Sequence, residues 1–288
     1  MHELTAIYWI KNETKHLPEY IEFHLMQGFD HFIFYDNGSV DGLLDVVKPY
    51  GDLVEIRYYP PTVTGPKNFW VAGECCREQR GKSKWIHFHS VDERIYCPDG
   101  RKIPEFLQEF EQYGGVLVAW EEFNSNGHEI RPRGLVIENY TQTFVDLGKH
   151  YKTITRPDVS IEFAGNPHGF RYIQGYYSVD ENHRNLSIEN NVSEYTYNRI
   201  KNHHYRTMSL EEFETKSNKG VLDHGMKYEN SRRPVAQEEW DYAHGLPSPW
   251  GQSTLGENTQ LLKFVEPVRE AIHERFKGNE HLLALVNH

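Results

Sequence analysis

Cysteine is scarce in this sequence, with three residues, at positions 75, 76 and 97, in a chain of 288. Three thiols are too few for a disulfide framework, and two adjacent cysteines lack the spacing of a zinc finger. The composition therefore excludes a disulfide-stapled scaffold and is typical of a protein in a reducing compartment.

Long apolar runs are also absent. No stretch approaches the ~20 apolar residues of a membrane-spanning helix. The opening residues, MHELTAIYWIKNE, carry an apolar stretch of only about seven residues before charge returns, which is shorter than a signal peptide needs. We therefore expect a cytoplasmic protein with no membrane span.

Positive charge is in deficit. The 31 Lys and Arg residues stand against 42 Asp and Glu, for a formal net charge of -11. A protein that holds a polyanion along its surface needs the opposite balance, so nucleic acid is not expected as a partner. The sequence also lacks G-x-G-x-x-G after its first predicted strand and G-x-x-x-x-G-K-[ST] anywhere, which argues against a dinucleotide fold and excludes a P-loop.

The first 120 residues alternate short apolar segments with helical patterns, as βαβ units do. The chain is long enough to bury a large core within one domain. We therefore predict an α/β fold with a mostly parallel sheet flanked by helices. The expected strands cover residues 4–10, 31–35, 53–58, a segment starting at 85, and 116–123, with helices over 17–27, from 41 to 47 and within 69–80.

From about residue 124 the chain is polar, aromatic and rich in His and Asn, with weak periodicity. Ser209 followed by Glu212 has capping-box spacing and predicts the start of a short helix. The other expected elements are strands within 134–140 and 169–177, an irregular excursion over 223–257 and an amphipathic helix over 261–276.

Three polar clusters follow predicted strands: Lys11-Asn12-Glu13, Asp36-Asn37-Gly38-Ser39 and Asp92-Glu93. Ligands of a doubly wound sheet bind beyond the carboxyl ends of its strands, so the clusters predict one cleft. Adjacent Asp92 and Glu93 point to opposite faces of a strand, so one can face the cleft while the other is held elsewhere. Carboxylates beside phosphate oxygens fit Mg²⁺ or Mn²⁺. Taken singly, each cluster also fits an ordinary turn or surface loop.

The clusters belong to a longer ordered series of motifs. The series runs K-N-E at 11–13, L-P-E-Y at 17–20 with His24, D-N-G-S-V-D-G at 36–42, S-V-D-E at 90–93, W-E-E-F-N-S-N-G-H at 120–128, N-H-H-Y at 202–205 with Ser209 and Glu212-Phe213, and N-T-Q-L-L at 258–262. In this order it resembles the GT-A glycosyltransferases of the family-2-like and galactan-synthase-like group, related to glycosyltransferase family 92. The resemblance spans roughly residues 5 to 270.

The resemblance implies a single GT-A domain, with a Rossmann-like mixed sheet. Residues 1–123 are then the nucleotide-sugar-binding half, and residues 124–288 are the acceptor-binding half with a C-terminal helix. It further implies a nucleotide-diphosphate sugar as donor, a glycan or glycolipid as acceptor, and Mn²⁺ or Mg²⁺ as cofactor.

The resemblance also implies a donor and metal site. Asp36 and Asp41 are expected to hold the base or ribose, and Asp92 and His204 the metal ion. Ser90 stands where the family has the first Asp of its D-x-D motif. The full set of donor-binding candidates is Asn12, Glu13, Asp36, Asp41, Ser90, Lys67 and Arg233.

An inverting transfer needs a general base for the acceptor hydroxyl, and the candidates are Glu121 and Glu122. Neighbours on a strand face opposite ways, so only one of them lines the cleft, and we favour Glu122 because it shares a face with Trp120. The acceptor-binding candidates are Trp120, Trp250 and His128.

Two departures from the family pattern leave alternatives open. Ser90 replaces a carboxylate, which puts metal affinity in question, and Arg94 stands where an aromatic residue is usual. A catalytically inactive GT-A-like protein that binds a glycan or nucleotide is therefore a second hypothesis. A nucleotidyltransferase is a third, but the polar Lys11-Asn12-Glu13 lacks the glycine-rich, basic loop that such an enzyme uses.

Overall fold

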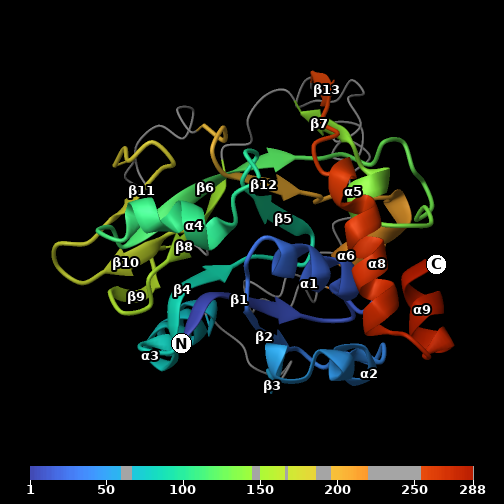
Figure 1. Ribbon diagram of the computed structural model, residues 1–288, viewed down its shortest axis with the longest axis horizontal. Coiled ribbons are helices and arrows are strands. Elements are labelled where there is room, and N and C mark those ends of the chain that lie inside the picture. Colours follow the sequence, from blue (N-terminus) through green and yellow to red (C-terminus); the bar gives the residue numbers. More distant parts are fainter. Residues whose placement is uncertain (60–66, 145–149, 166–167, 186–195, 220–253, 288) are drawn as a thin grey trace.

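The computed structural model describes residues 1–59, 67–144, 150–165, 168–185, 196–219 and 254–287, and these build an α/β fold around one large sheet (Figure 1). Within the described residues this sheet has nine strands in the order β3-β2-β1-β4-β8-β6-β12-β5, with β11 beside β6. Most of its neighbours are parallel, whereas β8 is antiparallel to β4 and β6, and β5 is antiparallel to β12. The predicted fold class, a mostly parallel mixed sheet flanked by helices, is confirmed.

The sheet strands come from both halves of the chain. They are β1 (His2–Ile10), β2 (His31–Asp36), β3 (Val54–Tyr58), β4 (Ser83–Phe88), β5 (Glu93–Tyr96), β6 (Gly115–Glu122), β8 (Tyr151–Thr155), β11 (Ser178–Val179) and β12 (Lys201–His204). Two small two-stranded sheets pair β9 (Ser160–Phe163) with β10 (Phe170–Tyr172), and β7 (Gln142–Phe144) with β13 (Leu255–Glu257).

Helices lie on both sides of the sheet. They are α1 (Leu17–Met26), α2 (Leu43–Val47), α3 (Lys67–Gln79), α4 (Ile103–Leu107), α5 (Val136–Asn139), α6 (Leu210–Lys219), α8 (Val265–Arg275) and α9 (Glu280–Asn287). Short 3-10 turns cover Lys48–Leu53, Gln108–Phe110 and Leu262–Phe264. In the part of the chain that the structure describes, no helix is long and apolar enough to cross a membrane.

Strand β1 shows why the first strands read as continuous apolar runs. Its side chains alternate between two hydrophobic clusters: Leu4 and Ala6 lie in one, and Ile7 and Trp9 lie in the other. The first cluster packs against α1 and α8, which lie side by side (Figure 1), and the second packs against α3. A strand with both faces covered in this way has no polar face to alternate with.

The expected strand within 134–140 is wrong, because this segment forms the short helix α5. The carboxylate of Glu19 accepts hydrogen bonds from the backbone N–H groups of Val136 (2.6 Å) and Ile137 (3.2 Å), at the first turn of the helix. A carboxylate there satisfies N–H groups that a helix leaves unpaired. A long-range contact thus decides the local structure.

Glu19 also explains Arg94, one of the two residues that depart from the family pattern. The Arg94 guanidinium is fully buried and donates to the Glu19 carboxylate (Nη2 to Oε1, 3.0 Å) and to the carbonyl oxygens of Val91 (2.7 Å) and Glu93 (3.0 Å). One buried ion pair therefore joins α1, α5 and the start of β5.

The Glu19→Ala variant should lose about 3–5 kcal/mol of unfolding free energy, because it leaves the Arg94 charge buried without its partner. Urea titration followed by circular dichroism measures the loss. The matched control is Glu74→Ala, which removes a partner of the exposed Arg77 on α3 and should cost no more than about 1 kcal/mol. Equal losses in the two variants would contradict the assigned role of Glu19.

Candidate active site

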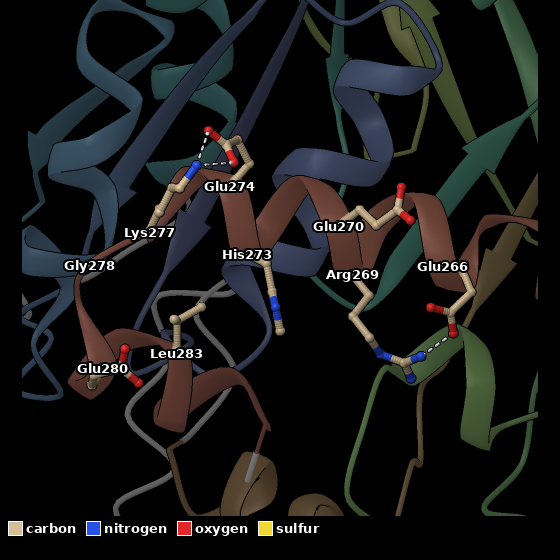
Figure 2. Close-up of a pocket in the computed structure, with 9 residues that line it drawn as sticks. All are labelled: Glu266, Arg269, Glu270, His273, Glu274, Lys277, Gly278, Glu280 and Leu283. Atoms are coloured by element: carbon tan, nitrogen blue, oxygen red, sulfur yellow. Dashed lines mark hydrogen bonds and ion pairs between the residues drawn. The ribbon is translucent and has the colours of Figure 1, made fainter.

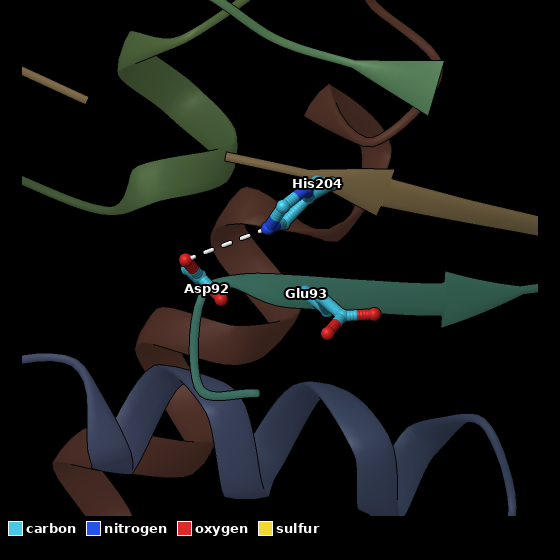
Figure 3. Close-up of side chains that lie close together, drawn as sticks. All are labelled: Asp92, Glu93 and His204. Carbon is cyan, nitrogen blue, oxygen red and sulfur yellow. Dashed lines mark ion pairs between the residues drawn. The ribbon is translucent and has the colours of Figure 1, made fainter. Parts of the chain in front are cut away.

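The pairing of β12 brings together the residues of the predicted metal site. His204 ends β12, and it lies opposite Glu93 on β5 and Glu122 on β6. Asp92 immediately precedes β5, and its carbonyl accepts a hydrogen bond from the backbone of Tyr205 (2.9 Å). Figure 3 shows the Asp92 carboxylate facing the His204 ring, with 3.7 Å between Oδ2 and Nε2.

The His204 ring is held on two sides. Its Nδ1 lies 3.0 Å from the Glu122 carboxylate, and the ring packs on Trp120 with 4.1 Å between ring centroids. These contacts direct Nε2 at Asp92. Burial alone would lower the pKa of His204, but the carboxylates of Glu122 and Asp92 outweigh it and raise the pKa to about 9.

Glu93 points away from this pair (Figure 3). Both of its carboxylate oxygens accept hydrogen bonds. Its Oε1 accepts from the backbone N–H (3.0 Å) and hydroxyl (2.7 Å) of Ser90, and its Oε2 accepts from the Trp120 indole (3.1 Å) and from Asn202. Lys152 lies 3.9 Å away. The structure thus places the Asp92 carboxylate in the site and holds the Glu93 carboxylate in place by hydrogen bonds.

Asp92 keeps one oxygen unsatisfied. Its Oδ1 is buried without a hydrogen-bond partner among the described residues, whereas its Oδ2 pairs with the ammonium of Lys216 on α6. Burial alone would raise the pKa of Asp92, but Lys216 and His204 hold it well below the usual range, so the carboxylate is ionised. Asp92, Glu93 and His204 each offer a ligand atom within 4.8 Å of the others. An ionised carboxylate with an unmet oxygen fits a divalent cation such as Mn²⁺, which would displace the Nε2 proton of His204 in order to bind the imidazole nitrogen.

Glu121 lies on the opposite face of β6, as strand alternation predicts. Its Oε2 is 3.1 Å from His203 Nε2, accepts a hydrogen bond from Asn258 (2.8 Å) and is 3.5 Å from the Lys201 ammonium. Burial would raise the pKa of Glu121, but His203 above all lowers it to about 2. Of the two candidate bases, only Glu122 lies beside His204.

The loops after β1 and β2 are hydrogen-bonded to each other. Asn12 donates its backbone N–H to the Ser39 hydroxyl (2.9 Å), and its side-chain oxygen accepts from the Val40 N–H (2.9 Å). The Asp36 carboxylate accepts from the Ser39 N–H (2.8 Å). Asp41 Oδ2 accepts from the backbone (3.0 Å) and hydroxyl (2.9 Å) of Thr14, and its buried Oδ1 has no partner among the described residues.

This pair of loops lies at the same edge of the sheet as the Asp92 site. Strands β2 and β4 flank β1 in parallel, so Asp36 at the end of β2 and Ser90 after β4 are separated by two strand spacings, ~10 Å across the sheet. Burial would lower the pKa of Lys216, but the Asp92 carboxylate raises it, and Glu13 is close enough to add a smaller upward effect. His16 Nε2 lies 3.2 Å from Glu212 on α6. The structure thus brings the described donor and metal candidates to one edge, whereas Lys67 and Arg233 lie outside the described side chains.

Sequence reasoning missed Lys216. The helix that carries it was expected from the Ser209–Glu212 spacing, and the capping box is present: the Ser209 hydroxyl donates to Glu212 (2.7 Å) and accepts from its N–H (3.2 Å). Lys216 lies four residues after Glu212, on the same helix face. Because Glu212 belongs to the motif series, this spacing was the signal that could have identified Lys216.

Of the three acceptor candidates, the structure describes Trp120 and His128 but not Trp250. Trp120 is only 9% exposed and packs against His204, His150 (5.4 Å between centroids) and His168 (5.2 Å). His128 lies beside Tyr140, at 5.7 Å between ring centroids. Three predicted positions receive no side-chain description: Arg233 and Trp250 lie outside the described residues, as does the side chain of Lys67 at the start of α3.

A groove between α8 and α9 holds none of the predicted site residues (Figure 2). Acidic and basic side chains alternate along it, and Lys277 pairs with Glu274. The lining residues are Glu266, Arg269, Glu270, His273, Glu274, Lys277, Gly278, Glu280 and Leu283.

Fold and site together define an α/β protein with a carboxylate–histidine cluster at the carboxyl edge of a largely parallel sheet. The chain belongs to glycosyltransferase family 92, whose model matches residues 4–279. A glycosyltransferase family 92 protein of Ricinus communis is 21% identical over 94% of this chain and 49% of its own length. A galactan beta-1,4-galactosyltransferase of Arabidopsis thaliana is 25% identical over 35% of this chain and 21% of its own length. The chain thus spans at most about half the length of these curated relatives.

Solved structures show a more distant likeness. TarS of S. aureus is 12% identical, with a TM-score of 0.41, over 99% of this chain and 88% of that chain. Glucosyl-3-phosphoglycerate synthase of Mycobacterium tuberculosis, solved with Mn²⁺ and UDP, is 15% identical over 41% of this chain and 43% of that chain, with a TM-score of 0.28.

Replacing Asp92 by Asn should weaken Mn²⁺ binding at least about tenfold, because loss of even an outer partner of a metal site commonly has this effect. Mn²⁺ titration followed by electron paramagnetic resonance measures the affinity without any substrate. Glu121→Gln is the matched control, since it removes a buried carboxylate from the far face of the sheet and should leave the titration unchanged. A normal Mn²⁺ titration of Asp92→Asn would remove Asp92 from the metal site.

Proposed function

We propose that this chain is a glycosyltransferase domain that moves a sugar from a nucleotide-diphosphate sugar to a hydroxyl group of a glycan or glycolipid. The observation that carries the proposal is the Asp92 carboxylate, whose buried Oδ1 has no hydrogen-bond partner among the described residues and whose Oδ2 faces His204. Membership of family 92 supports the reaction class. A relative named galactan beta-1,4-galactosyltransferase supports a glycan as acceptor.

The donor would lie along the carboxyl edge of the sheet. Asp36 and Asp41, with Asn12 and Glu13 in the neighbouring loop, are proposed to bind the base and ribose. The ~10 Å between β2 and β4 suits a nucleoside at one end and its diphosphate at the other. In this arrangement residues 1–123 hold most of the donor contacts, and residues 124–288 supply His204 and the acceptor side. Lys67 and Arg233 are the further proposed contacts of the diphosphate.

Asp92 and His204 are the proposed ligands of Mn²⁺ or Mg²⁺. A divalent cation bound there would neutralise the charge that develops on the departing diphosphate. Glu122 would fix the ring orientation of His204 by accepting its Nδ1–H, as carboxylates commonly do for metal-bound histidines.

Glu122 is also the proposed general base of an inverting displacement. One of its oxygens contacts His204, so the proton of the acceptor hydroxyl would pass to the other. The hydroxyl oxygen attacks the anomeric carbon as the bond to the diphosphate breaks on the opposite side. Trp120, Trp250 and His128 are the proposed residues of the acceptor side.

One observation favours a second candidate, a catalytically inactive protein that binds a nucleotide or a glycan. Ser90 supplies no carboxylate, and its hydroxyl is engaged with Glu93 (2.7 Å). A site with one carboxylate fewer binds a divalent cation less strongly.

A nucleotide panel separates the two candidates. We expect one of UDP, GDP, CDP and dTDP to raise the melting temperature, more so with Mn²⁺ present, and the matching nucleotide sugar to be hydrolysed slowly. Differential scanning fluorimetry and release of free sugar are the measurements. Binding without hydrolysis or transfer would favour the inactive protein, and no shift with any nucleotide would refute the proposed function.

Glu122→Gln should reduce sugar transfer by roughly 10²–10⁴-fold, the usual contribution of a general base. Its amide oxygen can still accept from His204 Nδ1–H, so nucleotide and Mn²⁺ affinity should stay near the wild-type values. Steady-state transfer and the nucleotide melting shift give the two readouts. Unchanged transfer would rule out Glu122 as the base.

A further inference from the structure

Lys216 occupies a position at the site that the proposed reaction leaves without a role. Its ammonium contacts Asp92 Oδ2 and lies 3.4 Å from the carbonyl oxygen of Arg206. The Lys216 side chain is 43% exposed, whereas that of Asp92 is 6% exposed. The ammonium thus reaches from the surface to a buried carboxylate.

Helix α6, which carries Lys216, is attached to the rest of the protein through Glu212. Besides the capping box with Ser209, the Glu212 carboxylate accepts a hydrogen bond from the Tyr140 hydroxyl (2.7 Å) and lies 3.2 Å from His16 and 3.4 Å from Arg131. The first turns of α6 are therefore fixed over the loop that precedes α1. The position of Lys216 follows from these contacts, since it is one helical turn beyond Glu212.

The charges of the site leave Asp92 as the carboxylate open to a cation. Ser90 contributes none, and Glu93 is satisfied by Ser90, Trp120, Asn202 and Lys152. The negative charge of Asp92 is met by Lys216. A divalent cation that binds Asp92 must therefore compete with the ammonium for the carboxylate.

We propose that Lys216 is the resident counter-cation of Asp92, and that its ammonium moves to the diphosphate of the donor when the metal ion and donor bind. The inference rests on the proposed function. A lysine side chain has four methylene groups joined by rotatable bonds, and its compact ammonium carries three N–H donors. Nζ can therefore exchange one anionic partner for another while α6 stays in place. Lysine is also a common point-charge ligand of phosphate.

This role predicts opposite effects on two ligands. Removing the ammonium frees Asp92 Oδ2 and should tighten the binding of a metal ion alone. The same change deletes a positive contact and should weaken the binding of a diphosphate. A purely structural role for Lys216 would weaken both, or change neither.

The test compares wild type with Lys216→Met and Lys216→Gln. Mn²⁺ alone, followed by electron paramagnetic resonance, should bind about three- to tenfold more tightly to both variants, and magnesium pyrophosphate, followed by calorimetry, about tenfold more weakly. Lys216→Arg keeps the charge and should retain most of the pyrophosphate affinity. Lys277→Met, in an exposed pair with Glu274 just after the end of α8, is the control for loss of a lysine and should change neither affinity.

Unchanged or weaker Mn²⁺ binding in both folded variants would overturn the counter-cation role, and unchanged pyrophosphate binding would overturn the diphosphate contact. Failure of the proposed function itself gives a different result: the wild-type protein then binds neither Mn²⁺ nor magnesium pyrophosphate, and the inference falls with the proposed function.

Discussion

The pairing of β12 between β5 and β6 is the interaction on which the site depends. All four residues of Lys201–His204 pair with β5 and the last three pair with β6, and the register places His204 beside Glu93 and Glu122. Without this insertion β5 has no partner in the sheet, because β12 is its neighbour among the described strands. The same backbone hydrogen bonds therefore complete the sheet and bring an imidazole to the carboxylate of Asp92.

Four carboxylates meet in this small region, and strand geometry gives each a different environment. Glu93 is enclosed by donors, Glu121 is held by His203 on the far face, and Glu122 contacts His204. Asp92 alone of the four keeps a fully buried oxygen without a hydrogen-bond partner among the described residues. Burial makes each of these charges costly unless it is paired, so the pairing pattern decides which carboxylate can accept a cation.

Local patterns in the sequence predicted much of this arrangement. The strands of the first half and the Ser209–Glu212 cap follow from spacing within a few residues, whereas Asp92 lies in the turn before β5 and not on one strand with Glu93 as predicted. What spacing could not provide is long-range: Glu19 accepts the first N–H groups of α5, and the contacts of Glu212 with His16, Tyr140 and Arg131 hold α6 where Lys216 reaches Asp92. The family resemblance placed His204 near Asp92, but the distance of 3.7 Å and the contact with Glu122 required the folded chain.

The position of His204 also bears on how the molecule folds. Asp92 and His204 are about 110 residues apart along the chain, so their contact closes a long loop whose entropic cost must be met before the contact forms. The parallel strands β1 to β4 can assemble from the first 88 residues, whereas β5 waits for a partner that arrives far later. Proteins rich in such distant contacts fold slowly. A nascent or partly refolded chain would therefore hold the completed strands β1 to β4 next to an unfinished edge, with the backbone groups of β5 exposed to any other strand that could pair with them.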